Sequence, residues 1–300
     1  MGVRGIDISE HQASLDVEKV ARDNGVGFAF VRTNYGAHHD DRWFHSHCDA
    51  AERAGALIVP YVYVLASDIR GSIDDAQRIA GGRYESMIVD WEHGSGGGAE
   101  LRRAHELLWE RGFTTPVVYD PKWYWESVGS PDVSWLRGRV RGHWKSWYAD
   151  NQARSFDDAL ARVPAYVWDD NRGGIPTVIV QFTGTGRLNG YGGNLDLNYF
   201  PGSRAELAEL LGSEDVNLNE QRVPVSGAPE DDYTEMADIA LGAAVGNARS
   251  ANVKLDELLN RPGVELTEAQ LDALADRVAG RLGGTFAGQV ADLLAARLRD

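Results

Sequence analysis

Residues 87–92 read Met-Ile-Val-Asp-Trp-Glu, an apolar run that ends in two carboxylates one residue apart. Side chains at positions i and i+2 of a strand point to the same face, so Asp90 and Glu92 are predicted to share one surface. Two acids held that close repel each other, and one of them tends to keep its proton near neutral pH. Cleavage of a glycosidic bond requires such a pair of acid and base. Two solvated acids at a strand end are the alternative interpretation.

Apolar runs of this kind alternate with helical patterns over the first two thirds of the chain. Strands that alternate with helices favour parallel pairing, and eight strands in this length predict an irregular TIM-like barrel of the α/β class. A doubly wound open sheet is the structural alternative. The candidate strands are 3–8, 27–32, 57–64, 86–91, 115–119, 142–148, 165–168 and 177–182, and the candidate helices are 16–24, 41–54, 72–81 and 99–111.

The character of the sequence changes near Gly212, after which aromatic residues nearly vanish. We therefore predict a barrel domain over 1–212, a polar linker with two prolines over 213–229, and a small all-helical unit over 230–300. Thr267 and Gln270 form a capping-box signature, and an apolar stripe with spacings of three and four follows them. Two helices of this size bury little by themselves, so we expect them to pack on the barrel, to form a homo-oligomer or to dock on a cell-wall component. A small accessory helical unit without a ligand is the alternative.

Composition narrows the range of partners and compartments. A formal charge of −15 argues against a nucleic-acid partner, because phosphate contacts need clustered Lys and Arg. Cys48 is the only cysteine, which excludes an intrachain disulfide and a cysteine metal cluster. The N-terminus lacks the pattern of a signal peptide, and no apolar run reaches the roughly 20 residues of a membrane helix. We expect a protein made in a cytoplasm, without membrane insertion and without a metal or other cofactor.

Four acids fall at predicted strand ends. Asp7 ends the first strand, Asp90 and Glu92 end the fourth, and Asp196 follows the eighth. Barrel closure makes the first and last strands neighbours, so Asp7 and Asp196 are expected side by side, facing the other pair across the mouth. Catalytic groups of barrel enzymes sit at these carboxyl ends. Aromatic side chains, on which sugar rings stack, follow the same ends: Tyr61, Tyr63, Tyr119, Trp147 and Tyr148.

Several motifs in order resemble the family 25 glycoside hydrolases, the Chalaropsis-type lysozymes of fungi, bacteria and phages. Residues 5–12 are similar to the family's opening Asp-x-Ser-x-x-Gln, and 30–36 to its second-strand segment ending in Gly. Residues 90–92 match its Asp-x-Glu pair, and 181–198 its closing segment. The resemblance covers about residues 3–205.

The resemblance implies an eight-stranded barrel with five helices and hydrolysis of the β-1,4 bond between N-acetylmuramic acid and N-acetylglucosamine in peptidoglycan. It implies that Glu92 is the general acid and that Asp90 stabilises the positive charge on the sugar. Asp7 and Asp196 would position the substrate and tune Glu92. Candidate substrate contacts are Gln12, Tyr61, Tyr63, Tyr119, Trp147 and Gln181. Trp91, bulkier than the family's usual residue, should point away from the site by strand alternation.

The missing signal peptide, set beside this resemblance, favours a phage endolysin that acts on the cell wall after release from the host cytoplasm. Two other functions stay open. Clustered acids also bind magnesium, so a metal-dependent phosphohydrolase is one. A non-catalytic barrel that binds the cell wall is the other.

Overall fold

The computed structural model describes residues 2–212. The predicted linker at 213–229 and the predicted helical unit at 230–300 lie outside these residues, and so does the predicted oligomer contact. None of the helices in the described part is long and apolar enough to span a bilayer.

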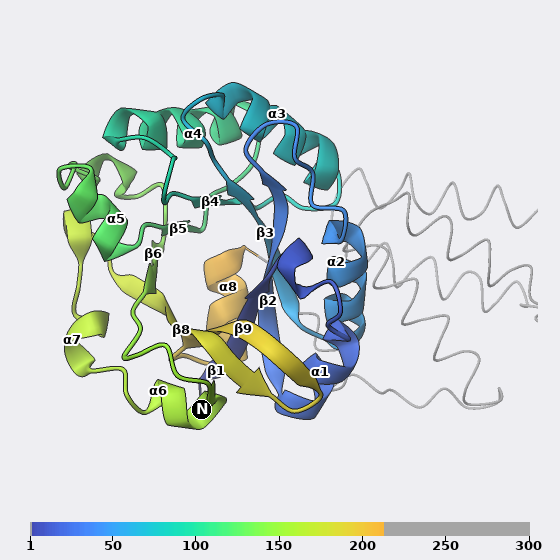
Figure 1. Ribbon diagram of the computed structural model, residues 1–300. Coiled ribbons are helices and arrows are strands. Elements are labelled where there is room, and N and C mark those ends of the chain that lie inside the picture. Colours follow the sequence, from blue (N-terminus) through green and yellow to red (C-terminus); the bar gives the residue numbers. More distant parts are fainter. Residues whose placement is uncertain (1, 213–300) are drawn as a thin grey trace, which may run out of the picture. The chain divides into compact units, whose positions relative to one another are not determined.

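Eight strands form a closed barrel, which confirms the predicted architecture (Figure 1). The order around the barrel is β6-β5-β4-β3-β2-β1-β9-β8, and a parallel β6–β8 pairing closes the ring. All neighbours are parallel except β9, which runs antiparallel to both β1 and β8. The strands are β1 (Val3–Ile8), β2 (Val26–Tyr35), β3 (Leu57–Tyr63), β4 (Ile88–Asp90), β5 (Val117–Tyr119), β6 (Gly142–Ser146), β8 (Thr177–Leu188) and β9 (Tyr191–Phe200), with a short outer strand β7 (Arg154–Ser155) on β8.

The last strands differ from the prediction. Residues 165–168, predicted as a strand, form helix α7 (Ala165–Trp168) directly after Pro164. A four-residue apolar run carries no period that separates strand from helix. The place next to β1 is taken by β9, which returns from β8 through the turn Asn189-Gly190, where Gly190 has φ +94°. Asn-Gly between two strand patterns is a hairpin signal, and the prediction overlooked it.

Helices cover the outside of the first half of the barrel (Figure 1). Helices α1 (Val17–Asn24), α2 (Phe44–Arg53), α3 (Ile69–Ala80) and α4 (Gly98–Glu110) follow β1 to β4 in turn, as predicted. Two start at carboxylate caps: Asp16 accepts the Lys19 amide at 3.0 Å, and Asp68 accepts the Gly71 amide at 2.8 Å. The second half carries only short helices, α5 (Lys122–Ser127), α6 (Phe156–Leu160) and α7, and the single turns are Glu10–Gln12, Ser134–Leu136 and Arg172–Gly174.

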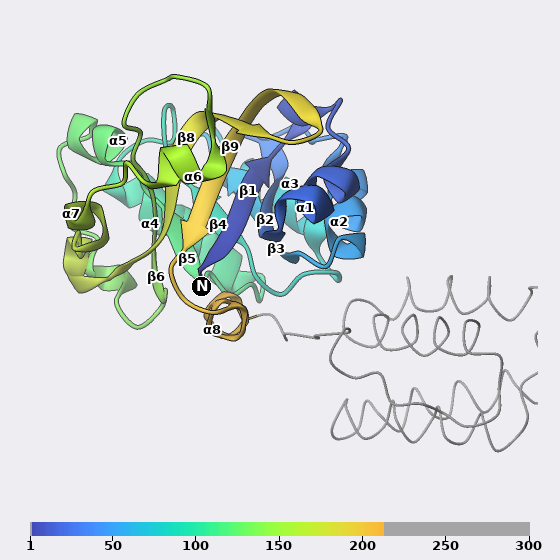
Figure 2. The same cartoon turned by 90° about the horizontal axis from the view of Figure 1, so that it is seen from below.

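Strand alternation separates two apolar layers. Outward side chains such as Ile6 and Val89 pack under the helices, whereas inward ones such as Phe28, Phe30 and Trp144 fill the barrel. The inner layer continues onto helix α8 (Arg204–Leu211), which contributes Leu207, Ala208 and Leu211. Figure 2 shows α8 at the end of the barrel where the N-terminus lies. Since this end is closed by apolar side chains, the inward polar residues are left to the carboxyl ends of the strands.

A glycine in β1 makes room for the inner layer, which gives a stability prediction. A Cβ on Gly5 would lie 2.2 Å from Cζ of Phe28, a fully buried ring. Gly5→Ala should therefore lower the free energy of unfolding by about 1–3 kcal/mol, because overpacking displaces the ring. Gly192→Ala is the matched control, since a Cβ there meets no atom within 4 Å. Urea unfolding of both variants measures the difference; equal midpoints would contradict the packing argument.

Candidate active site

The four predicted acids come from three strands of the barrel, and Asp196, predicted to follow the last strand, lies within β9. Asp7 of β1 and Asp196 of β9 are direct partners in the antiparallel ladder. Asp90 is the last residue of β4, and Glu92 follows it on the same face. The negative charges of Asp7 and Asp196 reach across the mouth, because both raise the pKa of Asp90. Asp7 and Asp90 are buried, whereas Glu92 and Asp196 are half-buried, so the site runs from interior to solvent.

The environment favours the protonated forms of these acids. Burial, together with the charge of Asp7, raises the pKa of Glu92 to about 7. Burial also raises the pKa of Asp7 to about 6, although hydrogen bonds from Asn198 and Gln181 oppose the rise. Burial and the charges of neighbouring acids hold the pKa of Asp90 and that of Asp196 well above the ordinary value. A half-buried carboxyl that keeps its proton up to neutral pH is suited to general acid catalysis.

This pKa shift also predicts the pH dependence of stability. Unfolded, Glu92 loses its proton near the ordinary value of 4.5, whereas folded it keeps the proton to about 7. Between these values the folded state binds more protons, so the free energy of unfolding falls as pH rises. Glu92→Gln removes the cost of holding an ionised carboxylate at this position in the folded state. The variant should therefore be more stable than wild type at pH 8, by about 1–3 kcal/mol, with little difference at pH 3.5. Urea unfolding at both pH values checks this; a destabilised variant at pH 8 would contradict it.

Two amide side chains fix the Asp7 carboxylate. Gln181 Nε2 and Asn198 Nδ2 both donate to Oδ2 of Asp7, at 2.9 and 2.7 Å. Asn198 is oriented in turn by Trp144, whose indole donates to its Oδ1 at 2.7 Å. Because Trp144 is fully buried inside the barrel, this chain of hydrogen bonds connects the apolar core to the acids. The orientation of Asp7 is therefore set by the barrel and not by a loop.

Two tyrosines complete the network on the opposite side of Gln181. The hydroxyl of Tyr119 donates to Oε1 of Gln181 at 2.8 Å, and the hydroxyl of Tyr148 donates to the same oxygen at 2.6 Å. Tyr119 is buried, whereas 39% of Tyr148 is exposed. Tyr148 therefore connects the acid network to solvent, and its ring is accessible to a molecule that binds at the mouth.

The predicted substrate contacts divide into two groups. Tyr61, Tyr119 and Gln181 line the interior, and Tyr63 pairs with Asp90 in the β3–β4 register. The other two, Gln12 and Trp147, do not line the interior of the barrel beside the acids.

Gln12 belongs to a local turn, because its Oε1 accepts the Ser9 amide at 3.0 Å in a capping box. Trp147 packs with the outer layer, and its indole donates to the Tyr166 hydroxyl at 3.1 Å. The structure therefore does not bring Trp147 to the acids. It brings the next residue, Tyr148.

Asn198 and Arg32 were absent from the predicted site, and Tyr148 was named as an aromatic residue at a strand end but not as a candidate substrate contact. Strand alternation relates them to the site. Asn198 lies two positions from the predicted Asp196, Tyr148 lies four positions from the inward Trp144, and Arg32 lies two positions from the inward Phe30. The same rule worked for Trp91, which was predicted to point away. Its indole is fully buried in the outer layer, 5.1 Å from the ring of Tyr124.

Metal binding was the basis of the phosphohydrolase alternative. Within residues 2–212 no group of three or more His, Cys, Asp or Glu side chains has an arrangement that would hold a metal ion. That alternative thus has no ligand set in this part of the chain.

Sequence comparison connects this geometry to known proteins. Residues 6–190 match the family described as glycosyl hydrolases family 25. A curated relative, lysozyme M1 of Streptomyces globisporus, is 26% identical over 221 residues, which is 70% of this chain and 71% of that protein.

Solved structures share the barrel. A bacterial lysozyme from Streptomyces coelicolor superposes with a TM-score of 0.55 at 23% identity, covering 70% of this chain and 97% of that one. The catalytic domain of endolysin ply40 from Listeria monocytogenes phage P40 gives a TM-score of 0.51 at 19% identity, covering 71% and 98%. At these identities the similarity shows the fold, and the family match covers more than half of the sequence. The chain therefore belongs to glycosyl hydrolases family 25 and is a glycoside hydrolase.

Proposed function

We propose that this enzyme is a muramidase, which hydrolyses the β-1,4 bond between N-acetylmuramic acid and N-acetylglucosamine in peptidoglycan. The observation that carries the proposal is the Glu92 carboxyl, half-buried at the barrel mouth with its pKa raised to about 7 beside three further acids. The curated relative, a lysozyme, supports the choice of substrate.

Glu92 is the general acid in this mechanism. Its proton passes to the glycosidic oxygen as the bond from that oxygen to the anomeric carbon breaks, so the leaving sugar departs as a neutral alcohol. Glu92 is then a carboxylate and accepts a proton from the water that attacks the anomeric carbon. The cycle ends with Glu92 protonated and with a new reducing end on the muramic acid.

Asp90 acts on the other side of the reaction. As the bond breaks, positive charge develops at the anomeric carbon, and an Asp90 carboxylate stabilises it directly or by orienting the substrate's own acetamido group. Oδ1 of Asp90 is buried and has no hydrogen-bond partner within residues 2–212. Asp7 adds negative charge that favours the protonated form of Glu92.

Peptidoglycan digestion tests the proposal. Purified full-length protein is incubated with cell walls, the new ends are reduced with borohydride, and the fragments are analysed by mass spectrometry. We expect fragments that end in reduced muramic acid. Fragments that end in reduced glucosamine would place the cut at the other glycosidic bond and refute the muramidase. Wall binding without new reducing ends would favour the non-catalytic barrel.

An endolysin role is a further part of this proposal. One of the structures with the same barrel comes from a phage endolysin, which supports it. Cytoplasmic expression should leave cells intact until the membrane is permeabilised, and lysis should then follow. Lysis without permeabilisation would contradict the requirement for separate release.

A further inference from the structure

An exposed aromatic side chain lies at the barrel mouth beside the acid cluster. Tyr35 is the last residue of β2, and 36% of it is exposed. In the strand register Tyr35 pairs with Tyr63 of β3, and Tyr63 pairs with Asp90 of β4. Asp90 is buried, Tyr63 is half-buried and Tyr35 is exposed. The three residues therefore form a row across neighbouring strand ends that runs from the acids to solvent.

The ring of Tyr63 connects Tyr35 to the segment that carries Glu92. The centres of the Tyr35 and Tyr63 rings lie 4.4 Å apart, with 39° between the ring planes. The Tyr63 hydroxyl donates to the carbonyl oxygen of His93, the residue after Glu92, at 2.6 Å. Tyr35 is therefore separated by a single aromatic ring from the backbone next to the proposed acid.

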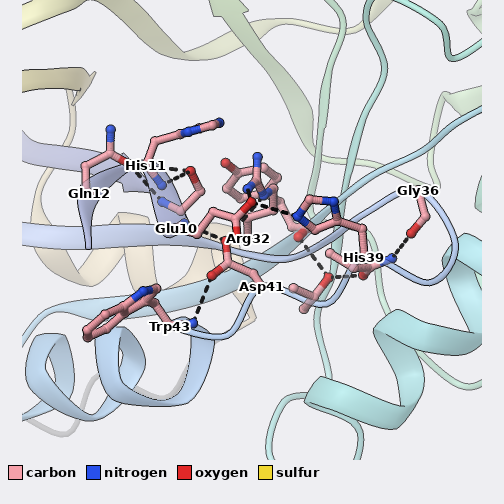
Figure 3. A network of polar contacts seen from close by, with 12 residues as sticks. Glu10, His11, Gln12, Arg32, Gly36, His39, Asp41 and Trp43 are labelled. Carbon is pink, nitrogen blue, oxygen red and sulfur yellow. Dashed lines mark hydrogen bonds and ion pairs between the residues drawn. The ribbon is translucent and has the colours of Figure 1, made fainter.

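The turn after β2 holds the Tyr35 ring in place. The Tyr35 amide donates to the His39 carbonyl oxygen at 3.0 Å, and the Gly36 amide donates to that of Tyr63 at 2.8 Å. The rings of His39 and Tyr35 meet edge to face with their centres 6.0 Å apart. His39 is itself fixed by Oε1 of Glu10, 2.7 Å from its Nε2, and Figure 3 shows this contact. A ring held between two others loses little freedom when a ligand packs on it.

The proposed reaction places a sugar beside this row. The anomeric carbon of the muramic acid faces Asp90, whereas Glu92 protonates the oxygen that departs with the next sugar along the glycan. That leaving sugar, an N-acetylglucosamine, must lie against the segment that carries Glu92, and the Tyr63 hydroxyl is bonded to the same segment. An uncharged sugar with an apolar ring face is the kind of group that packs on an exposed tyrosine.

We propose that Tyr35, with Tyr63 beside it, binds the ring of the leaving N-acetylglucosamine. This inference rests on the proposed muramidase function and adds a substrate contact on the leaving-group side of the cut bond. Tyr148, by contrast, donates to Gln181 on the side of the site where Asp7 lies.

Two substrates that share the muramic acid and differ in the leaving group test the proposal. One is the tetrasaccharide of two N-acetylglucosamine–N-acetylmuramic acid repeats, which has a single bond from muramic acid to N-acetylglucosamine. The other is the glycosyl fluoride of one repeat. Its carbon–fluorine bond breaks with departure of fluoride ion, so no leaving sugar is present. Tyr35→Ala should lower kcat/KM on the tetrasaccharide about tenfold, mainly through KM, and should leave fluoride release at the wild-type rate.

Conservative and control variants separate the ring contact from other effects. Tyr35→Phe keeps the ring and should retain the wild-type kcat/KM on the tetrasaccharide. Tyr166→Ala is the matched control, because Tyr166 of α7 is 64% exposed and its ring also meets another aromatic ring, that of Trp147, edge to face. It should leave both rates unchanged. If Tyr35→Ala does not fold, Tyr35→Leu replaces it, since leucine keeps apolar volume without a flat ring.

Equal losses on the two substrates would overturn the proposal, because Tyr35 would then act on the muramic side or on Glu92 itself. An unchanged kcat/KM on the tetrasaccharide would overturn it as well. If wild type does not release fluoride, the tetrasaccharide decides alone: a rise in KM supports the contact, and a fall in kcat without that rise contradicts it. Failure of the muramidase function is distinct, because wild type would then release no new muramic reducing end from the tetrasaccharide.

Discussion

Glu92→Gln is expected to lower kcat on peptidoglycan by about 10²–10⁴-fold, the range that loss of a positioned general acid causes. The amide has the same shape but cannot release a proton to the glycosidic oxygen. The leaving sugar would then depart as an alkoxide, which raises the barrier. The rate of muramic reducing-end release measures the effect, and circular dichroism verifies that the fold is kept.

Glu85→Gln is the matched control for this variant. Glu85 is exposed and precedes β4 at the opposite end of the barrel from Glu92. The same chemical change there should leave the rate at the wild-type level. If Glu92→Gln kept more than a tenth of the wild-type rate while remaining folded, Glu92 would lose its assignment as the acid.

Asp90→Asn is expected to lower kcat by about 10²–10³-fold, the cost of removing one electrostatic contact to a charge that develops in the transition state. The effect should fall on kcat with KM nearly unchanged, because the positive charge is absent from the bound substrate. Steady-state kinetics on solubilised glycan chains separate the two constants.

A rise in KM with kcat retained would give Asp90 a binding role only and would contradict charge stabilisation. The two variants also differ in pH dependence. Glu92→Gln should remove the basic limb of the residual activity, whereas Asp90→Asn should remove the acidic limb. These opposite losses distinguish an acid that must be protonated from a carboxylate that must be ionised.

The barrel was predictable where sequence periodicity is strong. Strands β1 to β6 and helices α1 to α4 were placed because apolar runs of strand length alternate with amphipathic segments. The final strand, β9, was not predicted, because it begins with Tyr191-Gly192-Gly193, a stretch with little strand character. Its pairing with β1 and β8 supplies what local propensity lacks.

The acid pair was predictable because Asp90 and Glu92 are adjacent in sequence and share a face by strand alternation alone. The encounter of Asp7 with Asp196 was predicted from barrel closure, although the strand that brings them together is β9 and not the eighth parallel strand. The outcome was right because closure next to β1 is required by any eight-stranded barrel.

Side-chain partners across the barrel could not be predicted. The bond from Asn198 to Asp7 joins residues 191 positions apart, and its existence depends on the stagger between β1 and β9. Trp147 was predicted as a substrate contact, whereas strand alternation from the inward Trp144 places Tyr148 on the same face as the acids. The environment of Arg32 could not be predicted for a related reason: its two ion-pair partners, Glu10 and Asp41, lie on separate loops.

The whole account depends on a protonated Glu92 at the pH at which the enzyme works. The most direct measurement is a ¹³C NMR titration of the Glu92 side-chain carboxyl in the full-length chain, assigned by comparison with Glu92→Gln. We predict a midpoint near pH 7, in agreement with the basic limb of kcat/KM. A midpoint near the ordinary value of 4.5 would leave Glu92 ionised at neutral pH and would contradict its role as the acid.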